Sequence, residues 1–252
     1  MYFCQNFHDM ISKIKTLLAI ALTSIFTQTY AQSFEGSITY ALDFELSEKM
    51  TSAGLTKAVM LEKLKSEHLW WDTITSTYKA GNMHSSLGHS GAWSVYRADS
   101  NKIFTFQNID SMDICEVNDA SIDLEFSMTG KMPRIIPKDT IVMVNNIACQ
   151  MIRVKWKTGT YDYYFNKEQF KIDPSLFSKH IYDGWAEFTK LSGCLPIKIV
   201  KTTKGIMSVS MTMVNSKASK VDDKLFTIPE LTPNAELNMV PMPNKQFYTF
   251  KR

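Results

Sequence analysis

The fold of this chain is decided by the stretch Phe34-Glu35-Gly36-Ser37-Ile38-Thr39-Tyr40-Ala41-Leu42-Asp43-Phe44-Glu45-Leu46. Apolar side chains and one glycine occupy its even-numbered positions, and mostly polar residues occupy the odd-numbered ones. Because successive side chains of a β-strand point to opposite faces, this alternation predicts a long strand with one buried face. We expect this strand to open the fold.

Much of the remaining chain has the same β character. Turn residues such as Gly81, Gly88 and Gly91 separate short apolar runs, and sequential strands with short connections pair antiparallel. The sequence therefore predicts a mainly β (α+β) fold, a strongly curved antiparallel sheet or incomplete β-barrel with helices covering the open side. The further strands are expected near residues 69–80, 82–87, 92–99, 102–107, 112–117, 141–144, 148–157, 160–166, 195–203 and 206–216.

Residues 1–31 have the pattern of a cleavable signal peptide. Lys13 and Lys15 precede the apolar run 16–26, and Thr29-Tyr30-Ala31 places a small residue before Gln32. A basic segment, a short apolar segment and a small-residue cleavage site are typical of secretory leaders. The apolar run is shorter than the roughly 20 residues that span a bilayer. We therefore expect an exported, periplasmic protein without a transmembrane segment in the mature chain, with secretion across the outer membrane left open.

The mature chain is expected to form one domain, over residues 32–228, because no repeat or long linker interrupts the strand pattern. Residues 229–252 follow it and contain four prolines, Pro229, Pro233, Pro241 and Pro243. Proline cannot donate a backbone hydrogen bond to a sheet. This segment is therefore predicted to be an extended, peripheral C-terminal tail.

A helix is predicted over residues 47–65. Ser47 is a suitable N-cap, and Glu48 lies favourably in the first turn. At 100° per residue, Leu55 and Val59 point away from the arc that holds Met50, Ala53, Met60, Leu61 and Leu64. A surface helix normally has one apolar stripe. Apolar residues on two sides therefore predict a helix that is covered from both directions, or one whose second face contacts something outside the chain.

The composition is that of a folded and nearly neutral globule. The chain is 44% hydrophobic and 12% aromatic, which argues against disorder, and its formal net charge is +3. No block of basic residues is present. We therefore expect no nucleic-acid partner, because such partners require a concentrated basic surface.

Three cysteines follow the predicted leader, Cys115, Cys149 and Cys194. An odd number cannot form a complete disulfide framework, and the spacing matches no zinc pattern. One bridge is compatible with an oxidising compartment, and the candidate pair is Cys149 with Cys194. The alternative is that all three are small buried residues.

The sequence contains no recognisable catalytic or metal-binding constellation. His84 and His89 flank a glycine-containing loop, but no third ligand accompanies them, and three are the usual minimum. His180 is isolated and suits a surface or capping role. No Gly-x-Ser-x-Gly nucleophile elbow occurs. We therefore expect a protein that is not an enzyme and that holds no metal or cofactor.

The methionines give a more suggestive functional signal. Met207, Val209, Met211 and Met213 lie on one face of the strand 206–216, and methionine lines adaptable apolar surfaces. Two interpretations stay open, a methionine-rich core and a cavity for an apolar ligand. The cavity is expected between the curved sheet and the helix 47–65, with a lining of Phe44, Leu55, Val59, Met207, Met211 and Met213.

The order of several short motifs adds a resemblance to known proteins. The motifs are the strand that begins Phe34-Glu35-Gly36-Ser37-Ile38-Thr39-Tyr40, then Asn145-Asn146-Ile147-Ala148-Cys149, the turn Thr158-Gly159, Gly193-Cys194-Leu195-Pro196-Ile197-Lys198, and Asp222-Asp223-Lys224-Leu225-Phe226-Thr227-Ile228-Pro229. Behind a signal peptide, this series resembles envelope families of Gram-negative bacteria related to GLPGLI proteins, which are similar to the outer-membrane lipoprotein carriers. The resemblance implies an incomplete β-barrel plugged by helices, and in the carriers the concavity holds acyl chains.

We therefore expect a non-enzymatic periplasmic protein that binds an apolar ligand, a lipid or a lipoprotein acyl chain, in a half-open β-barrel. The alternative is a structural or protein-interaction module of the cell envelope. Such a module would fill its core with its own side chains and bind an envelope protein partner instead of a small molecule.

Overall fold

The computed structural model describes residues 33–88, 90–239 and 241–251, with the backbone alone at Leu124. The predicted signal peptide lies outside these residues. From Ser33 onward the chain forms one compact unit. Within the part that the structure describes, every helix is too short or too polar to cross a membrane.

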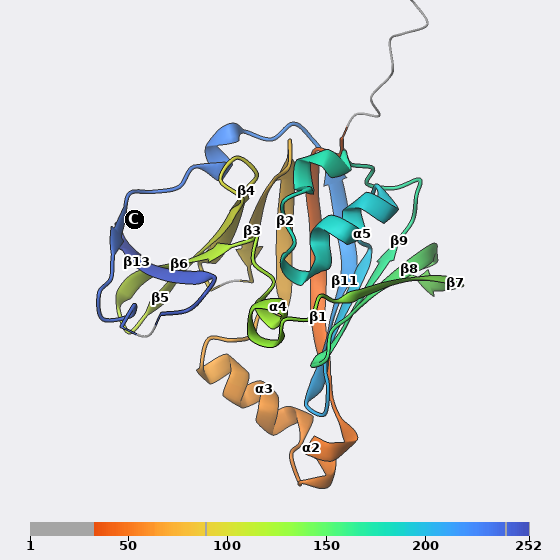
Figure 1. Cartoon of the computed structure of the whole chain (residues 1–252), viewed down its shortest axis with the longest axis horizontal. Coiled ribbons are helices and arrows are strands. Elements are labelled where there is room, and N and C mark those ends of the chain that lie inside the picture. The colour runs from red at the N-terminus through yellow and green to blue at the C-terminus, as the bar shows by residue number, and fades with distance from the viewer. Residues whose placement is uncertain (1–32, 89, 240, 252) are drawn as a thin grey trace, which may run out of the picture. The chain divides into compact units, whose positions relative to one another are not determined.

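Thirteen strands form one antiparallel sheet whose edges are β12 and β7, so that the described chain does not close into a barrel (Figure 1). The strand order is β12-β13-β6-β5-β4-β3-β2-β1-β11-β10-β9-β8-β7. The prediction of a mainly β, antiparallel and open sheet is confirmed. The strands are β1 (Gly36–Leu46), β2 (Thr73–Lys79), β3 (Asn82–Leu87), β4 (Ala92–Arg97), β5 (Lys102–Ile109), β6 (Met112–Asp119), β7 (Arg134–Val144), β8 (Ile147–Lys155), β9 (Gly159–Phe165), β10 (Lys198–Thr203), β11 (Met207–Ala218), β12 (Leu231–Pro233) and β13 (Lys245–Phe250).

The sheet consists of two meanders joined along one pair of strands. β1 to β6 are successive neighbours, as are β7 to β11, and β1 pairs with β11 between them. The register of that pair runs from Gly36 opposite Ala218 to Leu46 opposite Met207, with a shift between Thr39 and Tyr40. The alternating stretch at the start of the domain is therefore a central strand.

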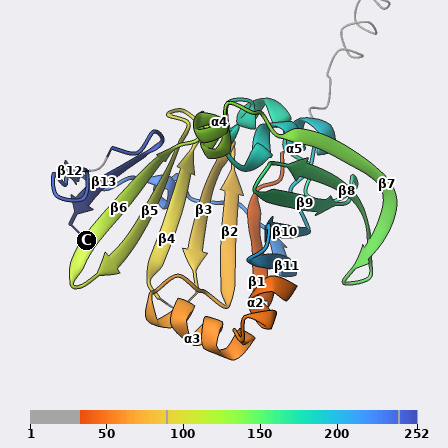
Figure 2. The same ribbon diagram turned by 60° about the horizontal axis from the view of Figure 1, so that its bottom comes forward.

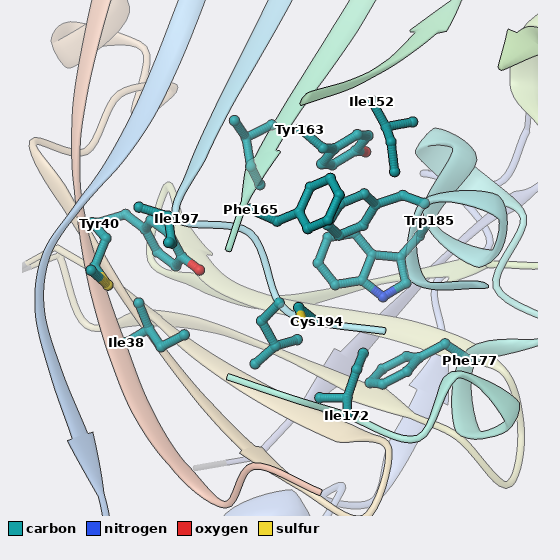
Figure 3. Close-up of a cluster of buried hydrophobic side chains, with 14 of the residues drawn as sticks. Ile38, Tyr40, Ile152, Tyr163, Phe165, Ile172, Phe177, Trp185, Cys194 and Ile197 are labelled. Atoms are coloured by element: carbon teal, nitrogen blue, oxygen red, sulfur yellow. The ribbon is translucent and has the colours of Figure 1, made fainter. Parts of the chain in front are cut away.

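The inner face of the sheet carries the larger apolar core. Two 3₁₀ helices, η1 (Pro174–Phe177) and η2 (Tyr182–Gly184), and the helix α5 (Trp185–Ser192) lie on this face (Figures 1 and 2). Trp185 packs edge-on against Tyr163 and Phe177, with ring centroids 5.9 and 6.2 Å away (Figure 3). Gly184 permits this approach, because a Cβ there would lie 2.7 Å from a methyl of Val154.

The outer face of β4 to β6 is covered by the C-terminal residues. Phe106 contacts Phe250 edge-on at 5.0 Å between ring centroids, and Phe226 of the 3₁₀ helix η3 (Asp223–Phe226) is buried in the same cluster. β13 extends the sheet beside β6. The expectation of a peripheral tail over 229–252 therefore differs from the structure, in which this segment supplies two strands and part of a core.

The predicted helix 47–65 is two shorter helices, α2 (Glu48–Ser52) and α3 (Lys57–Ser66). The break occurs at Gly54, whose φ of 86° lies in the left-handed region, and Thr56 caps α3 by accepting a hydrogen bond from the Val59 amide. Neither helix contains a buried residue. This segment extends beyond one end of β1 and β2 (Figure 1), so its apolar residues do not form the expected inner cover.

The three cysteines are free thiols, and all three are buried. The expected bridge between Cys149 and Cys194 is not formed in this structure. Both residues belong to the inner apolar core, which agrees with the alternative that they are small buried side chains. Cys115 lies in the outer cluster with Phe106.

A further short helix, α4 (Leu124–Thr129), precedes β7.

Candidate functional site

A cavity of about 250 Å³, here called the inner cavity, lies on the inner face of the sheet beside η2 and α5. Its lining comes from eight strands that are successive neighbours, β5, β4, β3, β2, β1, β11, β10 and β9. Strands lie about 4.8 Å apart, so a flat sheet would spread these eight over roughly 34 Å. One cavity of this size touches all of them only because the sheet bends around it.

The lining of the inner cavity is mostly apolar and aromatic. The apolar and aromatic members are Tyr40, Ile74, Tyr78, Met83, Leu87, Ile103, Tyr163, Tyr182, Trp185, Ile199 and Met211. The other members are three serines, Ser76, Ser85 and Ser94, and the three polar residues His180, Asp183 and Lys201.

Of the six lining residues expected from the sequence, Met211 lies in the inner cavity. Met213 lies in the apolar core and is 9% exposed, and Met207, the first residue of β11, is half-buried. Phe44 is fully buried, with its ring 5.0 Å from that of Trp70. Leu55 and Val59 belong to the α2–α3 segment, where Val59 is 55% exposed. The structure therefore does not bring these six together in one site.

The polar end of the inner cavity is an ion pair. Lys201 Nζ lies 2.7 Å from Asp183 Oδ2 and 4.7 Å from the centroid of the Tyr161 ring. Burial alone would lower the pKa of Lys201, but the Asp183 carboxylate raises it above its ordinary value. Asp183 has φ 60°, an uncommon conformation for a non-glycine residue. Tyr163 holds this corner by donating a hydrogen bond to the Asp183 carbonyl at 2.7 Å.

Two buried nitrogens in the lining have no hydrogen-bond partner among the described residues. They are His180 Nδ1 and Trp185 Nε1, on side chains that are 6% and 9% exposed. Burial lowers the pKa of His180 to about 4, so its imidazole is neutral at pH 7. An unpaired buried donor costs about 1–3 kcal/mol. Both nitrogens border the inner cavity, where an ordered water, an ion or a ligand would supply the missing partner.

A smaller hollow of about 160 Å³, here called the polar vestibule, adjoins the inner cavity and shares Tyr182 and Asp183 with it. Asp123 is 3% exposed there and accepts a hydrogen bond from Trp156 Nε1 at 2.9 Å. The full lining is Asp123, Glu125, Trp156, Thr158, Gly159, Tyr161, Tyr182, Asp183, Thr202 and Thr203. The two hollows together offer an apolar interior with a polar, aromatic exterior.

The three cysteine thiols lie in the two apolar clusters and line neither of these hollows. Burial raises the pKa of all three cysteines, that of Cys115 to about 12, so the thiolate form that reacts is disfavoured at neutral pH. Among the described residues, no group of three or more histidine, cysteine, aspartate or glutamate side chains could hold a metal ion. His89, one of the two histidines considered as ligands, lies outside the described residues.

Several residues of the site were not expected from the sequence. His180 was assigned a surface or capping role, whereas it is buried against Tyr96 with ring centroids 4.4 Å apart. Lys201 could have been found, because alternation places it on the same face as the buried Ile197 and Ile199. A lysine in an inward position is a signal of a partner carboxylate or a ligand.

Comparisons with known proteins leave the family of this chain open. No family model matches it, and no curated protein matches it. Among solved structures, a chain of PNGF-II in the C2 space group is similar over 77% of this chain, with a TM-score of 0.40 and 12% identity. The match spans 30% of that longer chain. A likeness at this level carries no argument about fold family or activity.

Proposed function

We propose that this chain is an exported, non-enzymatic protein that binds an apolar ligand, a lipid or acyl chain, in the inner cavity. The observation that carries this proposal is the cavity itself, which eight neighbouring strands of the bent sheet line, seven of them with apolar or aromatic side chains. In this proposal the cover of the open side is η1, η2 and α5 rather than the segment 47–65. The leader proposed over residues 1–31 would deliver the protein to the periplasm.

The size of the inner cavity is sufficient for useful affinity. An engineered apolar cavity of about 150 Å³ binds benzene, and the inner cavity measures about 250 Å³. A ligand that buries about six methylene groups gains about 5 kcal/mol before ordering costs. His180 and Trp185 would then hold a hydrogen-bonding group of the ligand, because their nitrogens lack partners within the described chain.

A substitution in β11 tests this proposal. Met211→Trp adds bulk to the inner cavity, and we expect it to weaken the binding of a fluorescent fatty-acid analogue about tenfold or more, as measured by titration. The matched control is Met207→Trp, because Met207 lies on the same face of β11 but outside the lining. The control should bind like the wild type. Thermal unfolding of both variants checks that they fold.

The outcome against the proposal favours the envelope interaction module. Absence of probe binding by the wild type, together with no lipid in an extract of the purified protein by mass spectrometry, would indicate a self-filled core. One observation favours this second function, the large exposed apolar side chains of β7, where Ile141 is 57% and Met143 62% exposed. Such residues are typical of a protein-binding surface when they are grouped.

A further inference from the structure

A groove of about 630 Å³ lies outside the polar vestibule and has a strongly basic lining. Its residues are Glu125, Lys131, Met132, Arg134, Lys155, Trp156 and Lys157, and it is here called the basic groove. Lys131, Arg134, Lys155 and Lys157 are all exposed. In the described part of the chain, none of these four side chains lies within 4 Å of a carboxylate as an ion pair.

The single carboxylate of the basic groove is already engaged by the protein. Glu125 accepts hydrogen bonds from the Lys157 amide and from both the amide and the hydroxyl of Thr158. Burial acts to raise the pKa of Glu125, but these hydrogen bonds lower it below its ordinary value. At neutral pH the Glu125 carboxylate is therefore ionised, and its oxygens are hydrogen-bonded to Lys157 and Thr158. The four cations around it remain available for a negatively charged partner.

Met132 lines the basic groove, and two further exposed apolar side chains lie on α4, one and three residues after the groove residue Glu125. Phe126 and Met128 of α4 are 44% and 75% exposed, and Met132 is 58% exposed. The helix is held at its start, because Asp123 accepts hydrogen bonds from the Phe126 amide at 2.7 Å and from Trp156 Nε1. Exposed apolar side chains on a helix whose position is fixed by hydrogen bonds indicate contact with an apolar phase or surface.

We propose that the basic groove and the exposed side chains of α4 dock onto the surface of an anionic phospholipid bilayer. Charge complementarity selects this occupant, because lysine and arginine beside an anionic headgroup layer attract it while neighbouring apolar side chains enter the headgroup–acyl boundary. A purely apolar partner would leave four cations without counter-charges. A soluble anion would leave Phe126, Met128 and Met132 in water.

The docked orientation has a consequence for ligand access. The basic groove shares Glu125 and Trp156 with the polar vestibule, and the vestibule shares Tyr182 and Asp183 with the inner cavity. A bilayer on this face would therefore adjoin the route to the cavity. This last step alone rests on the proposed function, since docking itself requires no ligand in the cavity.

Flotation with vesicles tests the docking directly. We expect the chain from Ser33 onward to bind vesicles of phosphatidylcholine with phosphatidylglycerol at low ionic strength, and not vesicles of phosphatidylcholine alone. The double substitution Lys155→Glu with Lys157→Glu should weaken this binding about tenfold or more. Met128→Ser should lower the binding that remains at high salt, and its exposed position means that it should not affect folding.

The matched control reverses the charge of two lysines, Lys217 and Lys220, at and just after the C-terminal end of β11. Lys217 and Lys220 line none of the three hollows. Lys217 lies ten residues along β11 from Met207, and the Met207 end is near the β8–β9 hairpin because Thr203 pairs with both Met207 and Gly159. At about 3.4 Å per residue, Lys217 is roughly 30 Å away from that hairpin. Lys217→Glu with Lys220→Glu should therefore retain vesicle binding.

Three results would overturn the docking proposal. They are absence of binding to anionic vesicles, equal weakening by the two double variants, and binding of soluble polyglutamate without binding of vesicles. The second result would mean that net charge alone is measured, and the third would assign the groove to an acidic protein segment. Each is separable from the cavity proposal, because the fatty-acid titration is done without vesicles and should be unaffected by Lys155→Glu with Lys157→Glu.

Discussion

The imidazole of His180 lies against the ring of Tyr96 and beside Trp185, and its Nδ1 has no hydrogen-bond partner among the described residues. Burial is the largest cause of its low pKa, and Lys201 acts in the same direction while Asp183 opposes it. The folded protein therefore holds this residue neutral at pH values where a solvated histidine is charged.

The lowered pKa of His180 predicts that the folded chain loses stability in mild acid. Between pH 6.5 and about 4 the unfolded chain binds a proton at this histidine that the folded chain does not. The free energy of unfolding should therefore fall by about 2 kcal/mol between pH 7 and pH 4.5 from this group. His180→Phe should remove that part of the loss, as measured by urea unfolding at both pH values. Equal losses in the two proteins would contradict the assignment.

At the scale of single residues, the sequence could predict which strand side chains face the core, but it could not predict which residues meet in one site. Alternation in β11 placed Met211 on an apolar face, and Met211 lines the inner cavity. His180 and Asp183 lie in an irregular segment whose path depends on packing against β8 and β9. No local pattern in the sequence specifies such packing, so these two residues could not be placed in advance.

At the scale of elements, strands with one buried face were predicted well. β3 has the predicted bounds, and β4, β5 and β6 begin at the predicted residues. β7 begins at Arg134 rather than at 141, because it is an edge strand with mostly exposed side chains and needs no alternation. α4 has six residues, too few to give a helical period, and Gly54 ends the pattern that predicted a continuous helix.

The attachment of α4 depends on Asp123, which caps the helix and bonds Trp156. Asp123→Ala removes a cap and a buried hydrogen bond, so the chain should lose about 2 kcal/mol of stability. The amides of α4 should exchange with solvent faster, as measured by hydrogen exchange. Asp123→Asn retains an acceptor for the cap and should cost less. Unchanged exchange in Asp123→Ala would mean that other contacts hold α4.

At the scale of the whole described chain, the C-terminal residues complete an outer core. The prolines of this segment suggested an extended path, and the path is indeed strand-like where β12 and β13 form. The sequence could not indicate that β13 pairs with β6, because the two are separated by more than 120 residues. Long-range pairings of this kind depend on the finished sheet rather than on local pattern.

Deletion of residues 229–252 should therefore destabilise the protein, since it uncovers Phe106 and Phe226. The point substitution Phe250→Ala should cost about 3 kcal/mol, because Phe250 is 7% exposed in that cluster. Phe247→Ala is the matched control, since Phe247 is half-buried on the opposite face of β13. Urea unfolding measures both. A stable, soluble deletion variant would instead support a dispensable tail.

The two meanders are joined by the pairing of β1 with β11, so residues that are synthesised early pair with residues that are synthesised late. Gly36 lies opposite Ala218, so the pair that unites the sheet closes only after nearly the whole domain is available. A chain that is synthesised from its N-terminus would expose the free edge of β1 until β11 is made. During that interval the inner cavity is incomplete, because β1 and β11 both line it; under the proposed function, ligand binding would have to follow this step. We expect a holding chaperone, or rapid release of the completed chain, to matter most at that stage.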